Sequence, residues 1–215
     1  MSIRKSVADI RKDYLADSLE REALAEHPVA QFQRWFERAV KAEVNEPNAM
    51  ALATRAGDRI AQRIVLLKGF DERGFVFYTN YESRKGQELA EHPQAALCFF
   101  WPELEQQIRI EGTVHKAEAS LSDQYYQSRG RGSRIGAWAS PQSQVIPDRD
   151  FLEQRVAARK AEFEGDEIFP RPDFWGGYRL QPDYIEFWQG RASRLHDRFA
   201  YSLVEGNWQI DRLAP

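Results

Sequence analysis

The sequence predicts a mainly β protein, an antiparallel sheet or barrel with α-helices at its periphery. Segments with strand patterns outnumber segments with helical periodicity, and short turns join most of them. Short turns favour antiparallel pairing, because parallel strands need long crossover connections. The chain has 215 residues, of which 42% are hydrophobic and 13% aromatic, enough for a core of its own. We expect an N-terminal arm over residues 1–27, which can act as a mobile lid, and a single domain over residues 28–215.

The overall composition argues against several classes of protein. Lys and Arg number 30 against 33 Asp and Glu, and this near balance argues against nucleic-acid binding. No apolar run approaches membrane-spanning length, and residues 1–14 lack the apolar region of a signal peptide. The four histidines are too scattered to form a metal site. The one cysteine, Cys98, lies in an apolar run, where we expect a buried, unreactive thiol in a reducing, cytoplasmic setting.

The first element with a clear pattern is a helix that begins at Pro28 and ends within residues 45–48. Proline suits the first helical position, where its missing N–H has no partner to lose. Apolar residues recur along one face of this segment, which predicts that the face packs on the core. The apolar stripe comprises Val29, Phe32, Phe36 and Val40, with Trp35 and Ala39 beside it.

Strand patterns dominate the middle of the chain. Apolar, β-branched and aromatic runs separated by turn residues predict strands over 49–54, 60–68, 74–80, 94–101 and 107–114. Helices are predicted near 83–91 and 120–128, each with a serine, Ser83 or Ser120, at its N-cap.

The last third of the chain mixes both kinds of element. Residues 129–147 are rich in Gly, Ser, Arg and Pro and predict a long loop, and a helix follows over about 149–164. Pro170-Arg171-Pro172 breaks the chain. Four strands are then predicted over 174–180, 183–189, 198–204 and 207–213, the last two joined at Glu205-Gly206-Asn207.

The tripeptide Ser83-Arg84-Lys85 is the first candidate binding site. If Ser83 caps a helix, Arg84 and Lys85 occupy its first turn, where the helix dipole disfavours cations. A bound anion removes this conflict, because backbone N–H groups and both cations then converge on it. A solvated surface pair is the alternative, and these residues alone support it equally well.

Two further cationic groups are candidates. Arg63 and Lys68 lie near the two ends of an apolar strand, at a separation that points them to opposite faces of a regular strand. Such strand-end charges more often face solvent. Residues 125–134 form a basic, hydroxyl-rich segment whose Tyr, Arg and Ser donors can surround a phosphate, with a disordered basic loop as the alternative. The glycines there lack the spacing of a dinucleotide-binding motif.

Residues 185–198 are the most informative segment. They begin as an aromatic strand and end in a cationic group, a combination that suits a flat, anionic, heteroaromatic ligand. We expect Trp188 to lie against this ligand. His196 lies between Arg194 and Arg198, which raises the case for a ligand site against that for a structural histidine. The tryptophans expected instead in the core or an interface are Trp35, Trp138, Trp175 and Trp208.

Together these motifs closely resemble the pyridoxine/pyridoxamine 5′-phosphate oxidase family, FMN enzymes that make pyridoxal 5′-phosphate. The family's C-terminal signature reads apolar, Glu, aromatic, Trp, Gln, four variable residues, Arg, aliphatic, His, acidic, Arg, and residues 185–198 fit at every position. The resemblance runs from about residue 28 to the end. Its other motifs, in family order, are residues 63–68, Tyr78-Thr79-Asn80, Ser83-Arg84-Lys85, Ile135-Gly136-Ala137-Trp138, Phe174-Trp175-Gly176-Gly177 and residues 211–215.

The resemblance implies a split β-barrel homodimer that binds FMN at the subunit interface. Arg63, Arg84, Lys85 and Ser143 would serve mainly the FMN phosphate, which resolves the conflict at the helix dipole. The full set of implied FMN contacts is Arg63, Ile64, Val65, Leu66, Leu67, Lys68, Tyr78, Thr79, Arg84, Lys85, Gln107, Gln142, Ser143, Trp188 and Arg198.

The resemblance also implies the reaction and its substrates, pyridoxine 5′-phosphate and pyridoxamine 5′-phosphate. A hydride passes from C4′ to FMN N5, and molecular oxygen reoxidises the flavin with release of hydrogen peroxide. Arg194 and His196 would be the catalytic residues, expected to orient the ring more than to act as a strong base. The implied substrate contacts are Arg11 and Tyr14 of an N-terminal lid, Lys68, Tyr125, Arg129 and Ser133 at the phosphate, and Arg194, Leu195 and His196 at the ring.

Three other functions remain as alternatives. An NADH-dependent flavin reductase on the same barrel has no use for a second phosphate site, so the group around Tyr125 and Arg129 argues against it. A non-catalytic carrier of pyridoxal phosphate would release no peroxide. A nucleic-acid-binding module that uses the basic segment is the most distant alternative.

Overall fold

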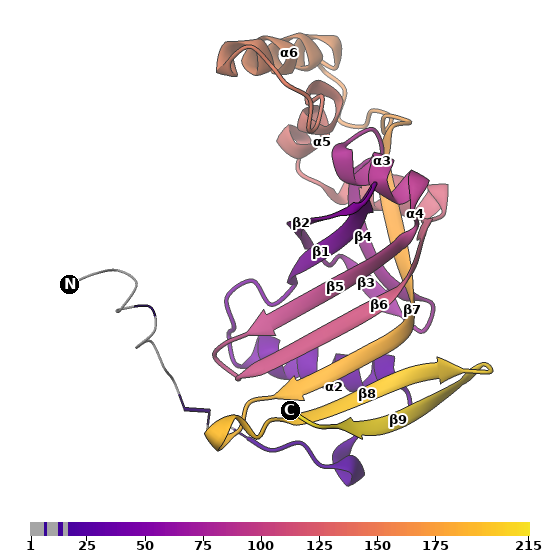
Figure 1. Ribbon diagram of the computed structural model, residues 1–215. Coiled ribbons are helices and arrows are strands. Elements are labelled where there is room, and N and C mark those ends of the chain that lie inside the picture. Colours follow the sequence, from indigo (N-terminus) through magenta and orange to yellow (C-terminus); the bar gives the residue numbers. More distant parts are fainter. Residues whose placement is uncertain (1–6, 8–12, 15–16) are drawn as a thin grey trace. The chain divides into compact units, whose positions relative to one another are not determined.

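The computed structural model describes residues 7, 13–14 and 17–215 (Figure 1). The chain divides into two compact units. The first comprises the described residues up to Pro47 together with Cys98–Ile110 and Asp183–Pro215, and the second comprises Asn48–Leu97 and Glu111–Pro182. The expected domain boundary at residue 28 stays a prediction. The strands that contribute to both units are β5 (Gln94–Trp101), β6 (Gln106–Lys116) and β7 (Trp175–Gln189).

The strands form an antiparallel sheet, so the predicted fold class is confirmed. Among the described residues the sheet has nine strands in the order β2-β1-β5-β6-β7-β4-β3, and β8 pairs with β7 and β9. The pairings β1–β2, β3–β4, β4–β7, β7–β8 and β8–β9 are all antiparallel. The remaining strands are β1 (Ala49–Ala56), β2 (Arg59–Leu66), β3 (Gly69–Asp71), β4 (Gly74–Asn80), β8 (Asp197–Val204) and β9 (Asn207–Leu213).

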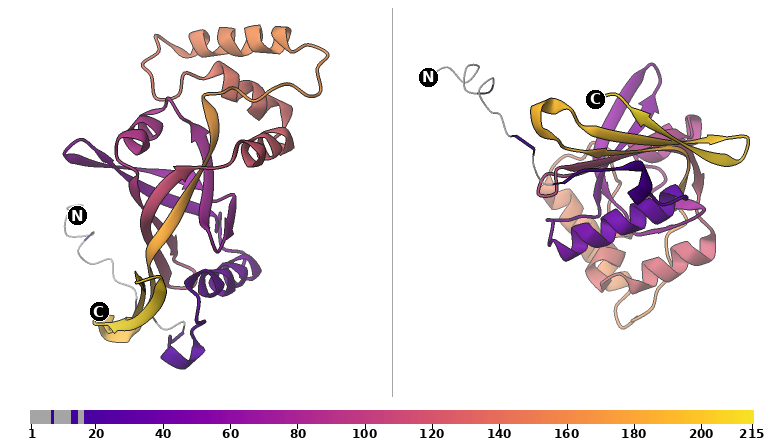
Figure 2. Two further views of the ribbon diagram at one scale, coloured as in Figure 1. Left: turned by 90° about the vertical axis from the view of Figure 1, so that its right-hand side faces the viewer. Right: turned by 90° about the horizontal axis from the view of Figure 1, so that it is seen from below.

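The core of the first unit forms where helix α2 (Pro28–Lys41) packs on strands (Figure 2). The ring of Phe32 lies 5.2 Å from that of Phe99 in β5, and the ring of Trp35 lies 5.2 Å from that of Phe187 in β7. The predicted start at Pro28 is confirmed, but the helix ends at Lys41, before residues 45–48.

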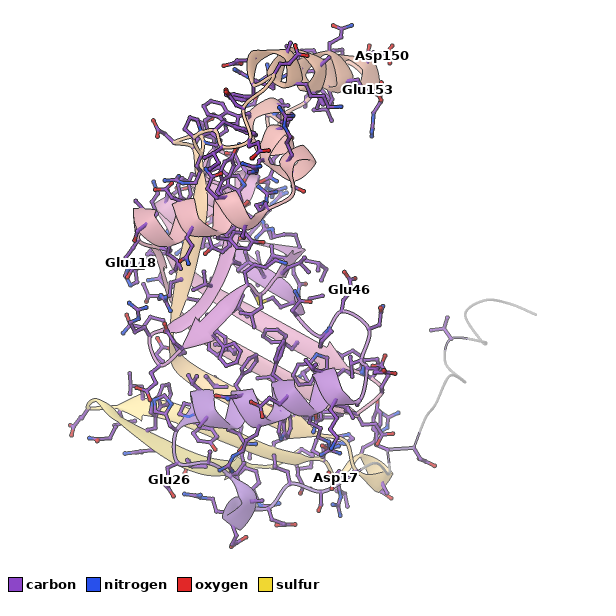
Figure 3. All side chains as sticks on the ribbon, turned by 180° about the vertical axis from the view of Figure 1, so that it is seen from behind. Asp17, Glu26, Glu46, Glu118, Asp150 and Glu153 are labelled. Carbon is purple, nitrogen blue, oxygen red and sulfur yellow. The ribbon has the colours of Figure 1, made fainter. Side chains whose placement is uncertain are left out.

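The prediction that Val40 belongs to the buried apolar stripe was wrong. Val40 is 53% exposed, whereas Val29, Phe32, Trp35 and Ala39 are buried. Successive helical residues are rotated by about 100° around the axis, so Val40 turns away from the face that Ala39 presents to the core. Near the same helix, Asp17, labelled in Figure 3, accepts a hydrogen bond of 2.6 Å from Arg38.

The second unit contains a helix where the sequence predicted a long loop. Helix α5 (Arg131–Ala139) lies within residues 129–147. Its glycines disfavour a helix by about 1 kcal/mol each. However, Ile135 is buried in an aromatic cluster with Tyr126, Phe163 and Phe169, and burial of such a side chain contributes about 1.5–3 kcal/mol. Tertiary packing therefore outweighs the local propensity.

The other helices of the second unit lie near their predicted positions. They are α3 (Arg84–Glu91), α4 (Ala119–Ser128) and α6 (Arg149–Glu162). Ser83 is the N-cap of α3, as predicted. Ser120 is not the N-cap of α4, because that helix begins earlier and Glu118 occupies the cap position (Figure 3). The Glu118 side chain makes no capping hydrogen bond and instead pairs with Arg73 at 3.2 Å.

Two strand predictions also change. Strand β7 is continuous where two strands were predicted, because Pro182 removes only one donor from the ladder and does not interrupt it. The short strand β3 was not predicted, and it pairs with β4.

Cys98 is only partly buried, and burial raises the pKa of its thiol. None of the described helices has the length and apolar character needed to cross a membrane.

Candidate functional site

The second unit contains a cavity of about 520 Å³ that brings together most of the predicted site residues of that unit. The cavity is lined from β2, β4, the first turn of α3, and α4 and α5. Lys68, predicted to serve both cofactor and substrate, is among the lining residues. The other predicted residues in the lining are Ile64, Val65, Leu66, Tyr78, Thr79, Lys85, Gln142, Tyr125, Arg129 and Ser133.

One end of this cavity is the N-terminus of α3, where the predicted conflict between cations and the helix dipole is present. The Ser83 hydroxyl accepts a hydrogen bond of 3.3 Å from the Gly86 amide, so Arg84 and Lys85 are the first two helical residues. The Lys85 ammonium donates to Thr79 Oγ1 at 3.1 Å and to Gln142 Oε1 at 3.2 Å. Burial, together with nearby Arg63, lowers the pKa of Lys85. This end is therefore suited to an anion.

Arg63 and Arg84 meet through a buried carboxylate. Glu88, in α3, accepts a hydrogen bond of 2.6 Å from Arg63 and one of 2.8 Å from Arg84. Thr54 in β1 donates to the same carboxylate at 2.6 Å. The two arginines predicted for the FMN phosphate thus belong to one cluster.

Arg129 is a second cationic group in the cavity. Its guanidinium lies 4.6 Å from the ring centre of Trp175, and its Nη1 atom is buried with no hydrogen-bond partner among the described residues. Burial lowers the pKa of Arg129. A buried guanidinium nitrogen without an acceptor is costly, so this position favours an anionic ligand.

Aromatic rings form one wall of the same cavity. The rings of Tyr78 and Tyr125 stack with their centres 3.9 Å apart, and Trp175 lies nearly parallel to both. Trp175 was expected to pack in the core. It is 7% exposed and belongs to the aromatic cluster, but it also lines the cavity beneath Arg129.

A separate aromatic group lies in the first unit. The ring of His196 is 4.5 Å from that of Trp188, and Tyr14 is 5.7 Å from each of them. His196 Nδ1 accepts a hydrogen bond of 3.1 Å from the Arg191 amide, so the neutral ring carries its proton on Nε2. Burial and the charge of Arg194 lower the pKa of His196, against a smaller opposing effect of Asp197.

The segment that carries Arg194 has an unusual backbone. Ser193 and Arg194 have φ angles of 55° and 61°, in the left-handed region that non-glycine residues seldom occupy. Such strain concentrates at functional sites, where the surrounding structure maintains it. The neighbouring Leu195 side chain is 69% exposed.

Arg198 is held by a buried carboxylate in the first unit. Its Nε and Nη2 atoms donate to the two oxygens of Glu186 at 2.9 and 3.1 Å, and its Nη1 donates to the Ala214 carbonyl at 2.7 Å. Glu186 is 2% exposed and also accepts from Arg109 and Tyr184. Hydrogen bonding to Glu186 raises the pKa of Arg198.

The remaining predicted residues lie outside the cavity. Leu67 is buried and its amide donates to the Asn48 carbonyl at 2.8 Å. Ser143 is exposed, with a φ angle of 71°. Gln107 is partly buried on β6. Arg11 lies outside the described residues.

Sequence reasoning missed Glu88, Thr54 and the role of Trp175 in the cavity. The spacing of Arg84 and Glu88, four residues apart on one helix, was a usable signal for the ion pair. No local pattern connects Thr54 to Glu88, which are 34 positions apart in the chain.

A larger cavity of about 860 Å³ lies between α5, α6 and the segment that follows α6, and it contains none of the predicted site residues. Arg131 and Arg134 line it, but they donate hydrogen bonds to the carbonyls of Phe163 and Glu167. These arginines hold the loop after α6 in place. The Nε atom of Arg134 is, like Nη1 of Arg129, buried with no partner among the described residues. The smaller cavity is therefore the candidate site because it brings the predicted residues together.

Comparison with known proteins identifies the family of the chain. Residues 36–161 match the family described as pyridoxamine 5′-phosphate oxidase, and residues 175–215 match the pyridoxine 5′-phosphate oxidase C-terminal dimerisation region. The pyridoxine/pyridoxamine 5′-phosphate oxidase of Acaryochloris marina is 55% identical over 211 residues, which cover 98% of this chain and 96% of the relative. That of Polynucleobacter asymbioticus is 57% identical over 212 residues, 98% of this chain and 99% of the relative.

Solved structures are similar as well. PhzG from Burkholderia lata, in complex with tetrahydrophenazine-1-carboxylic acid, has a TM-score of 0.87 and 35% identity, covering 93% of this chain and 99% of that one. A pyridoxamine 5′-phosphate oxidase-related FMN-binding protein from Nostoc punctiforme has a TM-score of 0.69 at 19% identity, covering 90% of this chain and 99% of that one, which supports the split-barrel fold alone. The chain belongs to the pyridoxine/pyridoxamine 5′-phosphate oxidase family.

Proposed function

We propose that this protein is an FMN-dependent oxidase that converts pyridoxine 5′-phosphate and pyridoxamine 5′-phosphate to pyridoxal 5′-phosphate. Relatives that bear this name are 55% and 57% identical over nearly their whole length. The observation that carries the proposal is the pair of anion-binding groups in one cavity. Lys85 lies at the start of α3. Arg129, whose Nη1 atom has no hydrogen-bond partner among the described residues, lies over Trp175. Two groups of this kind suit two phosphorylated ligands, a cofactor and a substrate.

The residues around α3 fit the phosphate of FMN. Their donor set combines the amide end of a helix, two arginines and a lysine with no acidic residue in the first turn. We assign Arg63, Arg84 and Lys85 to this phosphate, with Tyr78, Thr79 and Gln142 beside the cofactor. FMN, when bound, supplies the redox chemistry by accepting the hydride and passing its electrons to molecular oxygen, which is released as hydrogen peroxide.

We assign the phosphate of the substrate to Lys68, Tyr125, Arg129 and Ser133. Trp175 holds the Arg129 guanidinium by its face, because a cation is attracted to the electron-rich centre of an indole ring. This arrangement leaves the edge of the guanidinium for phosphate oxygens. No carboxylate of the described residues is in hydrogen-bond contact with the Arg129 side chain, so this arginine binds an anion at little cost in exchanged partners.

Arg194 and His196 are proposed to position the pyridine ring. The neutral His196 ring presents an Nε2–H donor, because its Nδ1 atom is occupied by the Arg191 amide. A donor suits a hydrogen bond to an oxygen substituent of the substrate and does not suit removal of a proton. The contribution is therefore orientation, since hydride transfer requires a close and fixed approach of the two reacting atoms.

The protein is a homodimer, in keeping with its match to the C-terminal dimerisation region. We propose that FMN binds at the interface between the two subunits. We also propose a cytoplasmic setting, which the single cysteine of the chain supports because it leaves no intramolecular disulfide to maintain.

The absorption spectrum of the purified protein tests the function. A flavin spectrum is expected, with anaerobic bleaching on addition of pyridoxine 5′-phosphate and release of hydrogen peroxide once oxygen is admitted. NADH is the control. Bleaching by NADH and not by pyridoxine 5′-phosphate would identify a flavin reductase, and a colourless protein that binds pyridoxal 5′-phosphate would identify a carrier.

A further inference from the structure

The carboxylate of Glu88 connects three elements of the second unit. Glu88 belongs to α3, the helix that contacts β1 (Figure 1), and its side chain is 7% exposed. Its Oε2 atom accepts from Thr54 and from Arg63, each at 2.6 Å, and its Oε1 accepts from Arg84 at 2.8 Å. Thr54 in turn accepts a hydrogen bond from Nη1 of Arg63. A buried carboxylate with three donors fixes the side chains that supply them.

The arrangement is unfavourable for the helix taken alone. Arg84 and Lys85 lie in the first turn of α3, where the dipole disfavours cations, and no acidic residue lies in that turn. The pair of Arg84 and Glu88 also has the basic residue on the N-terminal side, the weaker of the two orders for helical ion pairs. Helix stability therefore does not account for these residues.

The hydrogen-bond geometry leaves donors for a ligand. Glu88 accepts from Arg84 at Nε, and the two terminal amino groups of Arg84 have no hydrogen-bond partner among the described residues. The Arg84 side chain is 66% exposed. Arg63 is held at both ends of its guanidinium, by Glu88 and by Thr54. The Glu88 carboxylate thus fixes the guanidinium groups of both Arg63 and Arg84.

The charge balance of the cluster also suits a phosphate. Arg63, Arg84 and Lys85 carry three positive charges, and Glu88 offsets one of them. Burial alone would raise the pKa of Glu88, but hydrogen bonds from Thr54, Arg63 and Arg84 lower it below its ordinary value, so the group is ionised at neutral pH. A phosphate dianion matches the two charges that remain.

We propose that Glu88 is a positioning residue for the FMN phosphate, which orients Arg63 and Arg84 from the side opposite the cofactor. This inference rests on the proposed function. Glu88 itself does not contact FMN in this arrangement. A ligand that lacks the phosphate gains nothing from the orientation of the two arginines.

The test compares FMN with riboflavin, which has the same ring and no phosphate. The affinity of the FMN-free protein for each flavin is measured by quenching of flavin fluorescence. Arg63 and Arg84 donate to different oxygens of Glu88, and Glu88→Gln replaces one of these oxygens by an amino group. One of the two arginines therefore loses its hydrogen bond to residue 88. We expect FMN binding to weaken about 10- to 100-fold, the equivalent of one charge-assisted hydrogen bond, with riboflavin binding unchanged.

Glu91→Gln is the matched control. It removes the same charge from the same helix, at a side chain that is 68% exposed, and it should leave both affinities unchanged. Thr54→Val provides a second variant in case Glu88→Gln does not fold. It removes one donor to the carboxylate and should weaken FMN binding about 3- to 10-fold, again without an effect on riboflavin.

Three results would overturn the proposal. Tighter FMN binding by Glu88→Gln would show that the carboxylate only repels the phosphate, and unchanged binding would show that the arginines need no support. Equal weakening for FMN and riboflavin would show a general structural role. If the wild-type protein itself bound no FMN, the proposed function would fail instead.

Discussion

Arg129 and Arg198 are held in two opposite ways. Arg198 donates to both oxygens of the buried Glu186, and this hydrogen bonding raises the pKa of Arg198. Arg129 has an aromatic ring in place of a carboxylate and a buried nitrogen without a partner, and burial lowers its pKa. All three guanidinium nitrogens of Arg198 donate hydrogen bonds within the chain, whereas Nη1 of Arg129 has no acceptor among the described residues.

The difference separates an arginine whose acceptors come from the chain from one whose acceptor we expect from a ligand. A carboxylate partner does not by itself exclude a contact with FMN, as Arg63 on Glu88 illustrates, and the implied FMN contact of Arg198 stays a prediction. Breaking a buried, hydrogen-bonded ion pair leaves an uncompensated charge, so such a pair contributes to stability once it has formed. A half-buried guanidinium without an acceptor gives no such benefit, so we expect its acceptor to come from a ligand. The comparison therefore predicts that loss of Arg198 lowers stability and loss of Arg129 lowers substrate binding.

The largest effect is expected for Arg198→Ala. It leaves Glu186 buried without its bidentate partner, and we expect the free energy of unfolding to fall by about 3 kcal/mol. Urea unfolding of the FMN-free protein measures this change. Adding Glu186→Gln to the same variant should recover part of the loss, because it removes a buried carboxylate charge that only Arg109 and Tyr184 then stabilise among the described residues. An unchanged urea midpoint for Arg198→Ala would show that the ion pair with Glu186 does not stabilise the protein, and Arg198 and Arg129 would then not differ in this respect.

Arg129→Ala should have the opposite profile. The loss of one charge-assisted contact to the substrate phosphate raises KM for pyridoxine 5′-phosphate about 10- to 150-fold. The flavin spectrum and the free energy of unfolding should stay near those of the wild type, because Arg129 has no carboxylate partner to strand. Loss of FMN with an unchanged KM would instead place Arg129 at the cofactor.

How far the sequence could predict this fold depends on where each signal lies. Strands β4 and β5 were predicted at their observed bounds, because their aromatic and apolar runs are local and end at turns. Helix α5 was missed, because it depends on Ile135 joining an aromatic cluster with Phe163 and Phe169. Those contacts come from distant parts of the chain and leave no local pattern.

The candidate site divides in the same way. Motifs identified Lys85 and Arg129 before any geometry was known, because the resemblance is carried by such residues. Glu88 and Thr54 lie outside those motifs, since their role depends on a register between β1, β2 and α3 that the sequence does not state. Trp175 was inside a motif, but its contact with Arg129 appears only in three dimensions.

Trp175→Phe sharpens the comparison by changing the support of Arg129 and not the arginine itself. A phenyl ring attracts a cation less than an indole does, and the loss of about 0.5–1 kcal/mol should raise KM for pyridoxine 5′-phosphate about 2- to 5-fold. The rate at saturating substrate should not change. A fall in that rate with KM unaffected would mean that Trp175 acts on the reacting ring and not through Arg129.

The smallest effect is expected for the titration of His196. Burial and the nearby Arg194 disfavour the charged form of this histidine. Burial and Arg194 lower its pKa below 6.5, so the folded protein holds the neutral ring at pH 7. As pH falls, the unfolded chain takes up its proton near pH 6.5 and the folded chain does so only at a lower pH. Stability therefore decreases between these two values and becomes level below the folded pKa.

Protonation of His196 should also slow flavin reduction, because the charged ring can no longer accept the Arg191 amide at Nδ1 and loses its orientation. The rate of anaerobic bleaching by pyridoxine 5′-phosphate should fall with an apparent pKa below 6.5. His196→Asn is the matched control, because its amide retains a donor and an acceptor but does not titrate in this range. An acid limb that persists in His196→Asn would assign the titration to another group and leave His196 with a purely structural place beside Trp188.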